Sequence, residues 1–279
     1  MDSLTLPKTQ RAGAFWERLE KFHKSYSRFV ADRITESGVE SPRRIRIAVI
    51  DTGVDFRHLG IMVANWVGAD AKDDDNELHG TNCAYLVHKA APQADIYVEK
   101  VFNKNALGFY EVGNLAKKHN EVVDDIENAI REASIKSPRL MFAAASTNGN
   151  NYLRAFPASY DPYVFCVHAS EGNGEDGGIN PNPPAGSGFN FMTLGIGLEV
   201  MERLMPNGGR KFPSYKTVVK SGTSFATPIA AGIAATVLDL AARVEAINTR
   251  AENNLRRPEG MKQMLNLMST HKWLGEGRV

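Results

Sequence analysis

A run of small residues from Ser221 to Ala235 constrains the fold more than any other part of the chain. It reads Ser-Gly-Thr-Ser-Phe-Ala-Thr-Pro, followed by Ile-Ala-Ala-Gly-Ile-Ala-Ala. The alanines favour a helix and Pro228 suits a first helical turn, so we expect a tight turn that leads into a buried helix. Ser224 would then lie near free backbone N–H groups, as a nucleophilic serine requires. A serine that merely caps the helix fits the same pattern.

Two further segments carry candidate catalytic groups. The apolar run Arg46-Ile-Ala-Val-Ile-Asp51 is followed by Thr-Gly-Val-Asp, and Leu78-His79-Gly-Thr-Asn-Cys-Ala lies at the start of an expected helix. A buried parallel strand that ends in a carboxylate delivers it to the carboxyl edge of a sheet. Asp51, His79 and Ser224 therefore each lie at the end of an element, in the chain order that subtilisin uses for its triad.

The three segments resemble the catalytic motifs of the subtilisin-like serine peptidases: Asp-Thr-Gly, His-Gly-Thr, and Gly-Thr-Ser followed by Ala-Thr-Pro. The resemblance covers about Arg46 to Val244. It implies an α/β fold, with a largely parallel sheet flanked by helices on both faces. It also implies a serine endopeptidase that hydrolyses polypeptide substrates through an acyl-enzyme, with Asp51, His79 and Ser224 as the triad. This chemistry requires no metal and no other cofactor.

Composition narrows the function classes. The chain has 279 residues and a formal net charge of +1, which argues against nucleic-acid or membrane-surface binding driven by bulk charge. We expect no transmembrane segment, and the N-terminus is too polar for a signal peptide. Only Cys83 and Cys166 are present, so a disulfide framework is not implied and a reducing compartment fits. The expected localisation is cytoplasmic.

The chain divides into three expected parts. Residues 1–41 form an N-terminal helical extension, 42–245 the catalytic domain and 246–279 a helical tail. The helical pattern from Ala12 to Ile34 fits either a helix packed on the domain surface or the remnant of an upstream helical domain or pro-segment. The tail is charged, and we expect it to pack loosely or to continue toward a partner domain.

Three polar features have alternative interpretations. Five carboxylates between Asp70 and Glu77 fit either a calcium site or a solvated acidic loop. Cys83, one helical turn after His79, fits a metal pair, a redox-sensitive thiol or a small buried side chain. We expect His168, near the end of a strand, to be structural.

The region between Phe102 and Leu140 departs from the family pattern. Helical patterns run from Val112 to His119 and from Asp124 to Ile135, and the segment 117–124, which spans their junction, is too charged for a buried strand. The family has a substrate-binding strand here. We therefore expect that one strand and part of a helix are missing, through divergence or a deletion in the gene model. One wall of the substrate cleft would be altered.

The oxyanion site also departs from the pattern. Leu140 to Ser146 reads as a buried strand, after which the resemblance implies an asparagine that binds the oxyanion. Thr147 occupies that position and Asn148 follows it, so either the threonine hydroxyl or a bulged Asn148 would serve, or both residues form a plain turn. Loss of one such donor in subtilisin lowers the rate about 10²–10³-fold. The alternative function is therefore a catalytically weakened subtilase fold that serves as a binding or regulatory module.

Overall fold

The computed structural model describes residues 7–37, 44–55, 65–67, 75–101, 116–136, 138–147, 149, 153–182, 188–204, 214–244 and 247–269. Its strands form two parallel three-stranded sheets, ordered β1-β3-β2 and β4-β5-β6, and one antiparallel hairpin, β7-β8. The bounds are β1 Arg46–Asp51, β2 Asn65–Val67, β3 Asp95–Lys100, β4 Met141–Ala144, β5 Val164–Ser170, β6 Asn190–Leu194, β7 Leu198–Leu204 and β8 Ser214–Lys220. This arrangement confirms the expected α/β fold with a largely parallel sheet.

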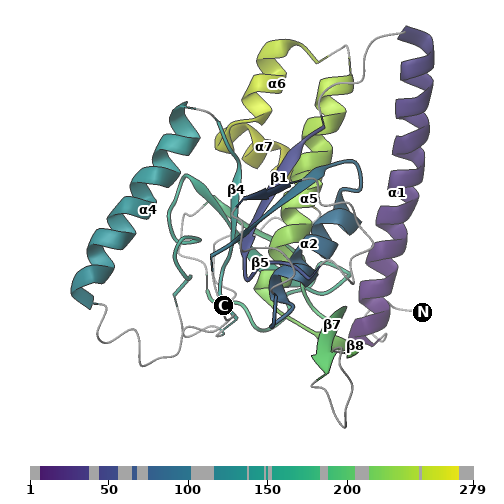
Figure 1. Cartoon of the computed structure of the whole chain (residues 1–279). Helices are drawn as coiled ribbons and strands as arrows, with labels where there is room; N and C mark the ends of the chain where they lie inside the picture. The colour runs from purple at the N-terminus through teal and green to yellow at the C-terminus, as the bar shows by residue number, and fades with distance from the viewer. Residues whose placement is uncertain are drawn as a thin grey trace, which may run out of the picture.

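Helix α5 (Thr223–Arg243) joins the two parallel sheets (Figure 1). It packs against α2 (His79–Ala90), against β1 and against all three strands of the second sheet. Its Ala235 belongs to the apolar cluster of β1 and β3, and its Ala226 and Ala230 belong to that of β5. Small side chains let α5 approach both layers closely. A Cβ on Gly232 would lie 2.6 Å from that of Ala90, which is why the α2–α5 crossing requires glycine.

The start and length of α5 differ from expectation. The helix begins at Thr223, so Pro228 is its sixth residue and not part of the first turn. With 21 residues, α5 is also long and apolar enough to cross a membrane by length and composition, contrary to the expectation that no such stretch exists. However, 61% of its most apolar window is buried inside the protein, and a core helix meets the same criterion.

The N-terminal helix is not separate from the core. Helix α1 (Lys8–Ser37) begins before and ends after the expected range of 12–34. Its Ala12 is buried in one cluster with Phe225 and Ile229 of α5, and Phe15, Trp16 and Leu19 pack on the same cluster. Figure 1 shows α1 along one side of the molecule next to α2. The sequence pattern correctly predicted an amphipathic helix, but not that its apolar stripe faces the helix that carries Ser224.

The C-terminal part contains two helices, α6 (Thr249–Leu255) and α7 (Pro258–Met268). Met261 of α7 is fully buried with Phe165, Phe189 and Leu238. The expectation that this tail packs loosely is therefore wrong for α7, whereas α6 has no buried residue.

Helix α4 (Ala116–Lys136) replaces the two helical stretches expected between β3 and β4. The segment 117–124 lies inside it, which agrees with the prediction that this segment is no strand. In the described part of the chain no strand hydrogen-bonds β1 to β4, so α5, and not a continuous ladder, joins the sheets. Residues 102–115 lie outside the described residues, and the expected deletion is not tested.

Candidate active site

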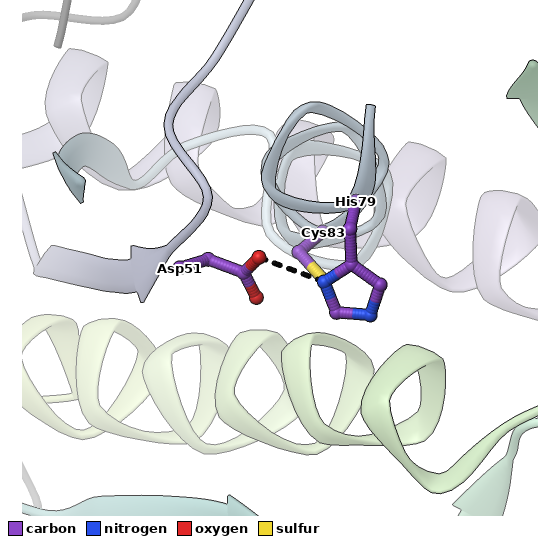
Figure 2. Close-up of side chains that lie close together, drawn as sticks. All are labelled: Asp51, His79 and Cys83. Atoms are coloured by element: carbon purple, nitrogen blue, oxygen red, sulfur yellow. Dashed lines mark hydrogen bonds and ion pairs between the residues drawn. The ribbon is translucent and has the colours of Figure 1, made fainter. Parts of the chain in front are cut away.

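Asp51 and His79 meet at the carboxyl end of the first sheet. Asp51 is the last residue of β1, and His79 is the first residue of α2. The Asp51 carboxylate accepts a hydrogen bond at 2.7 Å from Nδ1 of His79, as Figure 2 shows. That bond fixes Nδ1 as the protonated nitrogen and leaves Nε2 as a free base. The predicted acid–imidazole contact is thus formed.

A second, buried carboxylate holds the two segments together. Asp75 is fully buried and accepts hydrogen bonds from the hydroxyl of Thr52 and from both the backbone N–H and the hydroxyl of Thr81. The Thr52 hydroxyl in turn accepts from the N–H of Gly80. Because Thr52 follows Asp51 and Thr81 lies in the first turn of α2, Asp75 ties the acid to the imidazole.

The expectation of a solvated acidic loop is therefore wrong for Asp75, while residues 70–74 lie outside the described part. The sequence carried one usable signal for this role. Asp75 lies four residues before His79, where a carboxylate can accept from the free N–H groups at the start of a helix.

Gly80 allows the close contact between these segments. A Cβ at this position would lie 2.3 Å from the carbonyl oxygen of Gly53 and 3.2 Å from Cβ of Asp51. Any side chain would push α2 away from the loop that follows β1. The Gly of the His-Gly-Thr motif is thus required by packing.

Ser224 shares a cavity with His79. The cavity has a volume of about 340 Å³ and is lined by residues from both catalytic segments, including Glu77, His79, Thr147, Lys220, Ser224 and Phe225. Nε2 of His79 is buried, faces no hydrogen-bond partner among the described residues and therefore does not hold the Ser224 hydroxyl here. Catalytic hydrogen bonds are often long without substrate and tighten in the complex. The structure thus brings the three predicted residues to one site but forms only one of the two triad contacts.

Cys83 satisfies a carbonyl that Pro228 leaves free. Proline has no N–H, so Pro228 cannot donate to the carbonyl of Ser224 four residues earlier. The thiol of Cys83 lies 3.6 Å from that carbonyl oxygen and donates to it. The Cys83 side chain is buried, and burial raises the pKa of this thiol well above its usual value. The interpretation as a small buried thiol agrees with this position.

Asp51, His79 and Cys83 could also hold a metal ion by geometry, since their ligand atoms lie within 4.8 Å of one another (Figure 2). The environment does not favour it. Nδ1 of His79 is already engaged by Asp51, and metal binding needs a thiolate, which burial disfavours.

Hydrogen bonds join the β7-β8 hairpin, which leads to Ser224, to α2 and to the loop after β1. The side-chain amide of Asn82 in α2 donates to the carbonyl of Met201 and accepts from its N–H, at 2.9 and 2.8 Å. Asp55 is fully buried and binds the guanidinium of Arg203 and the hydroxyl of Tyr215, at 2.9 and 2.8 Å. Sequence reasoning missed these contacts because they join residues more than 100 positions apart.

The turn after β4 forms another wall of the cavity. Thr147 lines the cavity, and its hydroxyl lies 3.4 Å from that of Thr223. Ser146 has a φ of 123°, which is unusual for a residue other than glycine and marks a tight turn at this point. Asn148, the other candidate for the oxyanion, lies outside the described residues.

His168 lies away from this cavity and is fully buried in β5. Its Nε2 lies 3.2 Å from the side-chain oxygen of Asn190, and burial lowers its pKa. A buried, hydrogen-bonded position in a central strand agrees with the structural role expected from the sequence.

Comparisons with known proteins find relatives that are named as subtilisins or serine proteases. The chain is 28% identical to the subtilisin-like protease het-Q2 of Podospora anserina over 57% of this chain and 48% of the relative. It is 26% identical to subtilisin DY of Bacillus licheniformis over 75% and 81%, and 25% identical to the intracellular serine protease of Paenibacillus polymyxa over 80% and 73%. The chain therefore spans about half of the first relative and most of the other two. No family model matches the chain.

Solved structures agree on the fold. The patellamide maturation protease PatA matches with a TM-score of 0.56 at 22% identity, over 83% of this chain and 89% of that one. The prenylagaramide maturation protease PagA matches with a TM-score of 0.53 at 24% identity, over 75% and 82%. Three motifs in order and several related sequences make the chain similar to the subtilisin-like serine peptidases (subtilases), and the solved structures share its fold.

Proposed function

We propose that the protein is a serine endopeptidase that cleaves polypeptides through an acyl-enzyme. The observation that carries the proposal is the 2.7 Å contact between Asp51 and Nδ1 of His79, with Nε2 free beside the cavity that Ser224 lines. This arrangement provides a base of defined tautomer next to a hydroxyl at a helix N-terminus. Relatives that are named proteases support the same reaction.

In the proposed mechanism, substrate binding brings the Ser224 hydroxyl within reach of Nε2 of His79. The imidazole takes the hydroxyl proton as the oxygen attacks the peptide carbonyl, and then returns it to the leaving amine. Asp51 keeps the imidazole in the right tautomer and stabilises its charged form. Water then attacks the acyl-enzyme with His79 again as the base.

The developing oxyanion needs fixed donors. The backbone N–H of Ser224, near the start of α5, is one, because the first N–H groups of a helix have no internal partner. Thr147 lines the same cavity and can supply its hydroxyl, while Asn148 remains the alternative donor. A hydroxyl on a shorter side chain is a weaker replacement for an amide, so we expect lower activity than in relatives with asparagine.

The test is labelling with a fluorophosphonate probe, which reacts with activated serines. The wild-type protein should be labelled and the Ser224→Ala variant should not. Circular dichroism of both proteins excludes misfolding as the cause of a negative result. A well-folded wild type that remains unlabelled would refute the enzyme proposal and favour a binding module.

We further propose a cytoplasmic location and polypeptide substrates. The relative named intracellular serine protease and the two free, buried cysteines support the location. Domains or a pro-segment outside this chain are compatible with the partial coverage of relatives such as het-Q2. Fractionation of cells with an antibody against the protein tests the location.

A further inference from the structure

Helix α1 contacts α5, the helix that carries Ser224, near both ends of α5. Near the C-terminal end of α5, the hydroxyl of Tyr26 in α1 donates a hydrogen bond to the carboxylate of Asp239. Near the N-terminal end, an apolar stripe of α1 packs in one cluster with Phe225. This stripe consists of Ala12, Phe15, Trp16 and Leu19. The proposed mechanism uses neither contact.

Phe225 connects the stripe to the imidazole. Its side chain is 6% exposed, and the centroid of its ring lies 5.5 Å from that of the His79 ring, with 36° between the ring planes. This separation is typical of an aromatic pair in contact. Because packed side chains leave little free space, a shift of the stripe displaces Phe225, and Phe225 displaces the ring of His79.

The first turn of α1 packs on the loop between β6 and β7. Gly197 in this loop has a φ of 72°, and a Cβ on it would lie 2.9 Å from the carbonyl oxygen of Lys8. The hydroxyl of Ser221 accepts a hydrogen bond at 3.0 Å from the N–H of Gly197. The N–H of Gly222 donates at 2.9 Å to the carbonyl of Gly195 in the same loop. The loop on which α1 rests therefore holds the turn that leads into α5.

Polar contacts fix the start of α1 in place. Arg11 forms an ion pair with Glu171, and the two side chains are only 11% and 12% exposed. One turn and a half further along, the guanidinium of Arg18 donates at 2.6 Å to the carbonyl of Gly172. Ion pairs that are shielded from water lose less of their strength to screening than exposed ones do. The part of α1 next to Phe225 is therefore held firmly on the body of the protein.

We propose that α1 is a positioning element of the catalytic site, in which Phe15 acts through Phe225 to fix the ring of His79. This inference rests on the proposed peptidase function and extends the site to a helix outside the three motifs. A catalytic group that is misplaced by about 1 Å through a change far from the chemistry can cost about 10²-fold in rate. Loss of the stripe contact therefore lowers kcat, whereas KM, which depends on the walls of the cavity, changes little.

Two phenylalanines of α1 provide matched variants. Phe15 belongs to the stripe, whereas Phe22 is 45% exposed and stacks on Tyr26 with ring centroids 6.0 Å apart. Phe15→Ala should lower kcat on a quenched peptide substrate about 10–100-fold with a nearly constant KM. Phe22→Ala should leave both constants unchanged. Urea unfolding of each variant establishes that it is folded under the assay conditions.

A milder pair keeps the comparison available if Phe15→Ala does not fold. Phe15→Leu retains more of the apolar contact, so it should lower kcat in the same direction but by less, and Phe22→Leu is its control. An equal loss of kcat in the Phe15 and Phe22 variants, or no loss in either, would overturn the inference.

Nuclear magnetic resonance separates this inference from the proposed reaction. The ring protons of His79 are observed in protein that carries isotope-labelled histidine and are assigned by their loss in His79→Gln. They should shift or broaden in the Phe15 variants and in Phe225→Leu, and keep their wild-type positions in the Phe22 variants. This result supports the role of α1 even if the wild type hydrolyses nothing. Unchanged His79 signals in the Phe15 variants would refute it, even if the wild type is an active peptidase.

Discussion

Gly80→Ala is the sharpest test of how the fold holds the acid next to the imidazole. A Cβ at Gly80 would lie 2.3 Å from the carbonyl oxygen of Gly53, and these are backbone atoms that no rotamer change can move. Forcing an extra carbon into a packed site costs about 1–3 kcal/mol. Alanine in place of glycine within a helix returns about 0.5–1 kcal/mol. The difference between these two effects is an expected net loss of about 0–2.5 kcal/mol, centred at about 1 kcal/mol, in the free energy of unfolding.

Gly13→Ala is the matched control. Gly13 also lies within a helix, α1, but nothing lies within 4 Å of the position that a Cβ would take. The same chemical change should therefore stabilise the protein by about 0.5–1 kcal/mol. The two variants should move in opposite directions from the wild type.

Urea unfolding followed by circular dichroism measures both effects. Because the added carbon would also lie 3.2 Å from Cβ of Asp51, Gly80→Ala should lower kcat as the acid and His79 separate. Two alanine variants of equal stability would refute the packing argument. A destabilised Gly80→Ala with unchanged kcat would show that the contact supports the fold but not the alignment of the acid.

Four further results are expected. Asp75→Asn should lower the free energy of unfolding by about 1–3 kcal/mol in urea titrations, because an amide cannot accept all the hydrogen bonds that Thr52 and Thr81 donate. Asp125 is exposed, so the control variant Asp125→Asn should change the same free energy by less than about 0.5 kcal/mol. Cys83→Val keeps the volume but removes the donor to the Ser224 carbonyl, so a loss of about 1 kcal/mol is expected in the same assay, and no loss would show that the thiol contact is irrelevant. Asp51→Asn should lower kcat about 10⁴-fold on a peptide substrate by permitting the wrong tautomer of His79, and a decrease below tenfold would contradict the role of Asp51. Burial lowers the pKa of His168, so the unfolded state takes up a proton at a higher pH than the folded state does. The free energy of unfolding should therefore fall as the pH drops below about 6.5, by at most about 1.4 kcal/mol per pH unit. His168→Gln should show a shallower decrease between pH 7 and 5.5, and equal slopes for variant and wild type would exclude this linkage.

The local pattern of the chain was enough to predict most elements that carry the site. The apolar run before Asp51, the small residues around Ser224 and the helical spacing after His79 each reflect contacts that a strand or helix makes along its own length. Motif order then indicated the resemblance to the subtilisin-like peptidases and the candidate triad. The length of α1 and the merging of two expected stretches into the single helix α4 were harder to predict from the sequence, because a charged amphipathic segment does not show where its ends lie.

The sequence alone therefore determined which side chains we propose for the chemistry: Asp51, His79 and Ser224, each at the end of an element. Only the tertiary structure decided what surrounds them. It buried Asp75 beneath the acid and the imidazole, fastened Asn82 to Met201 and placed the thiol of Cys83 on the carbonyl that Pro228 leaves free. It also left Glu77 exposed in the cavity, two residues from buried Asp75. Burial and pairing depend on partners far away in the chain, and a local pattern carries no record of them.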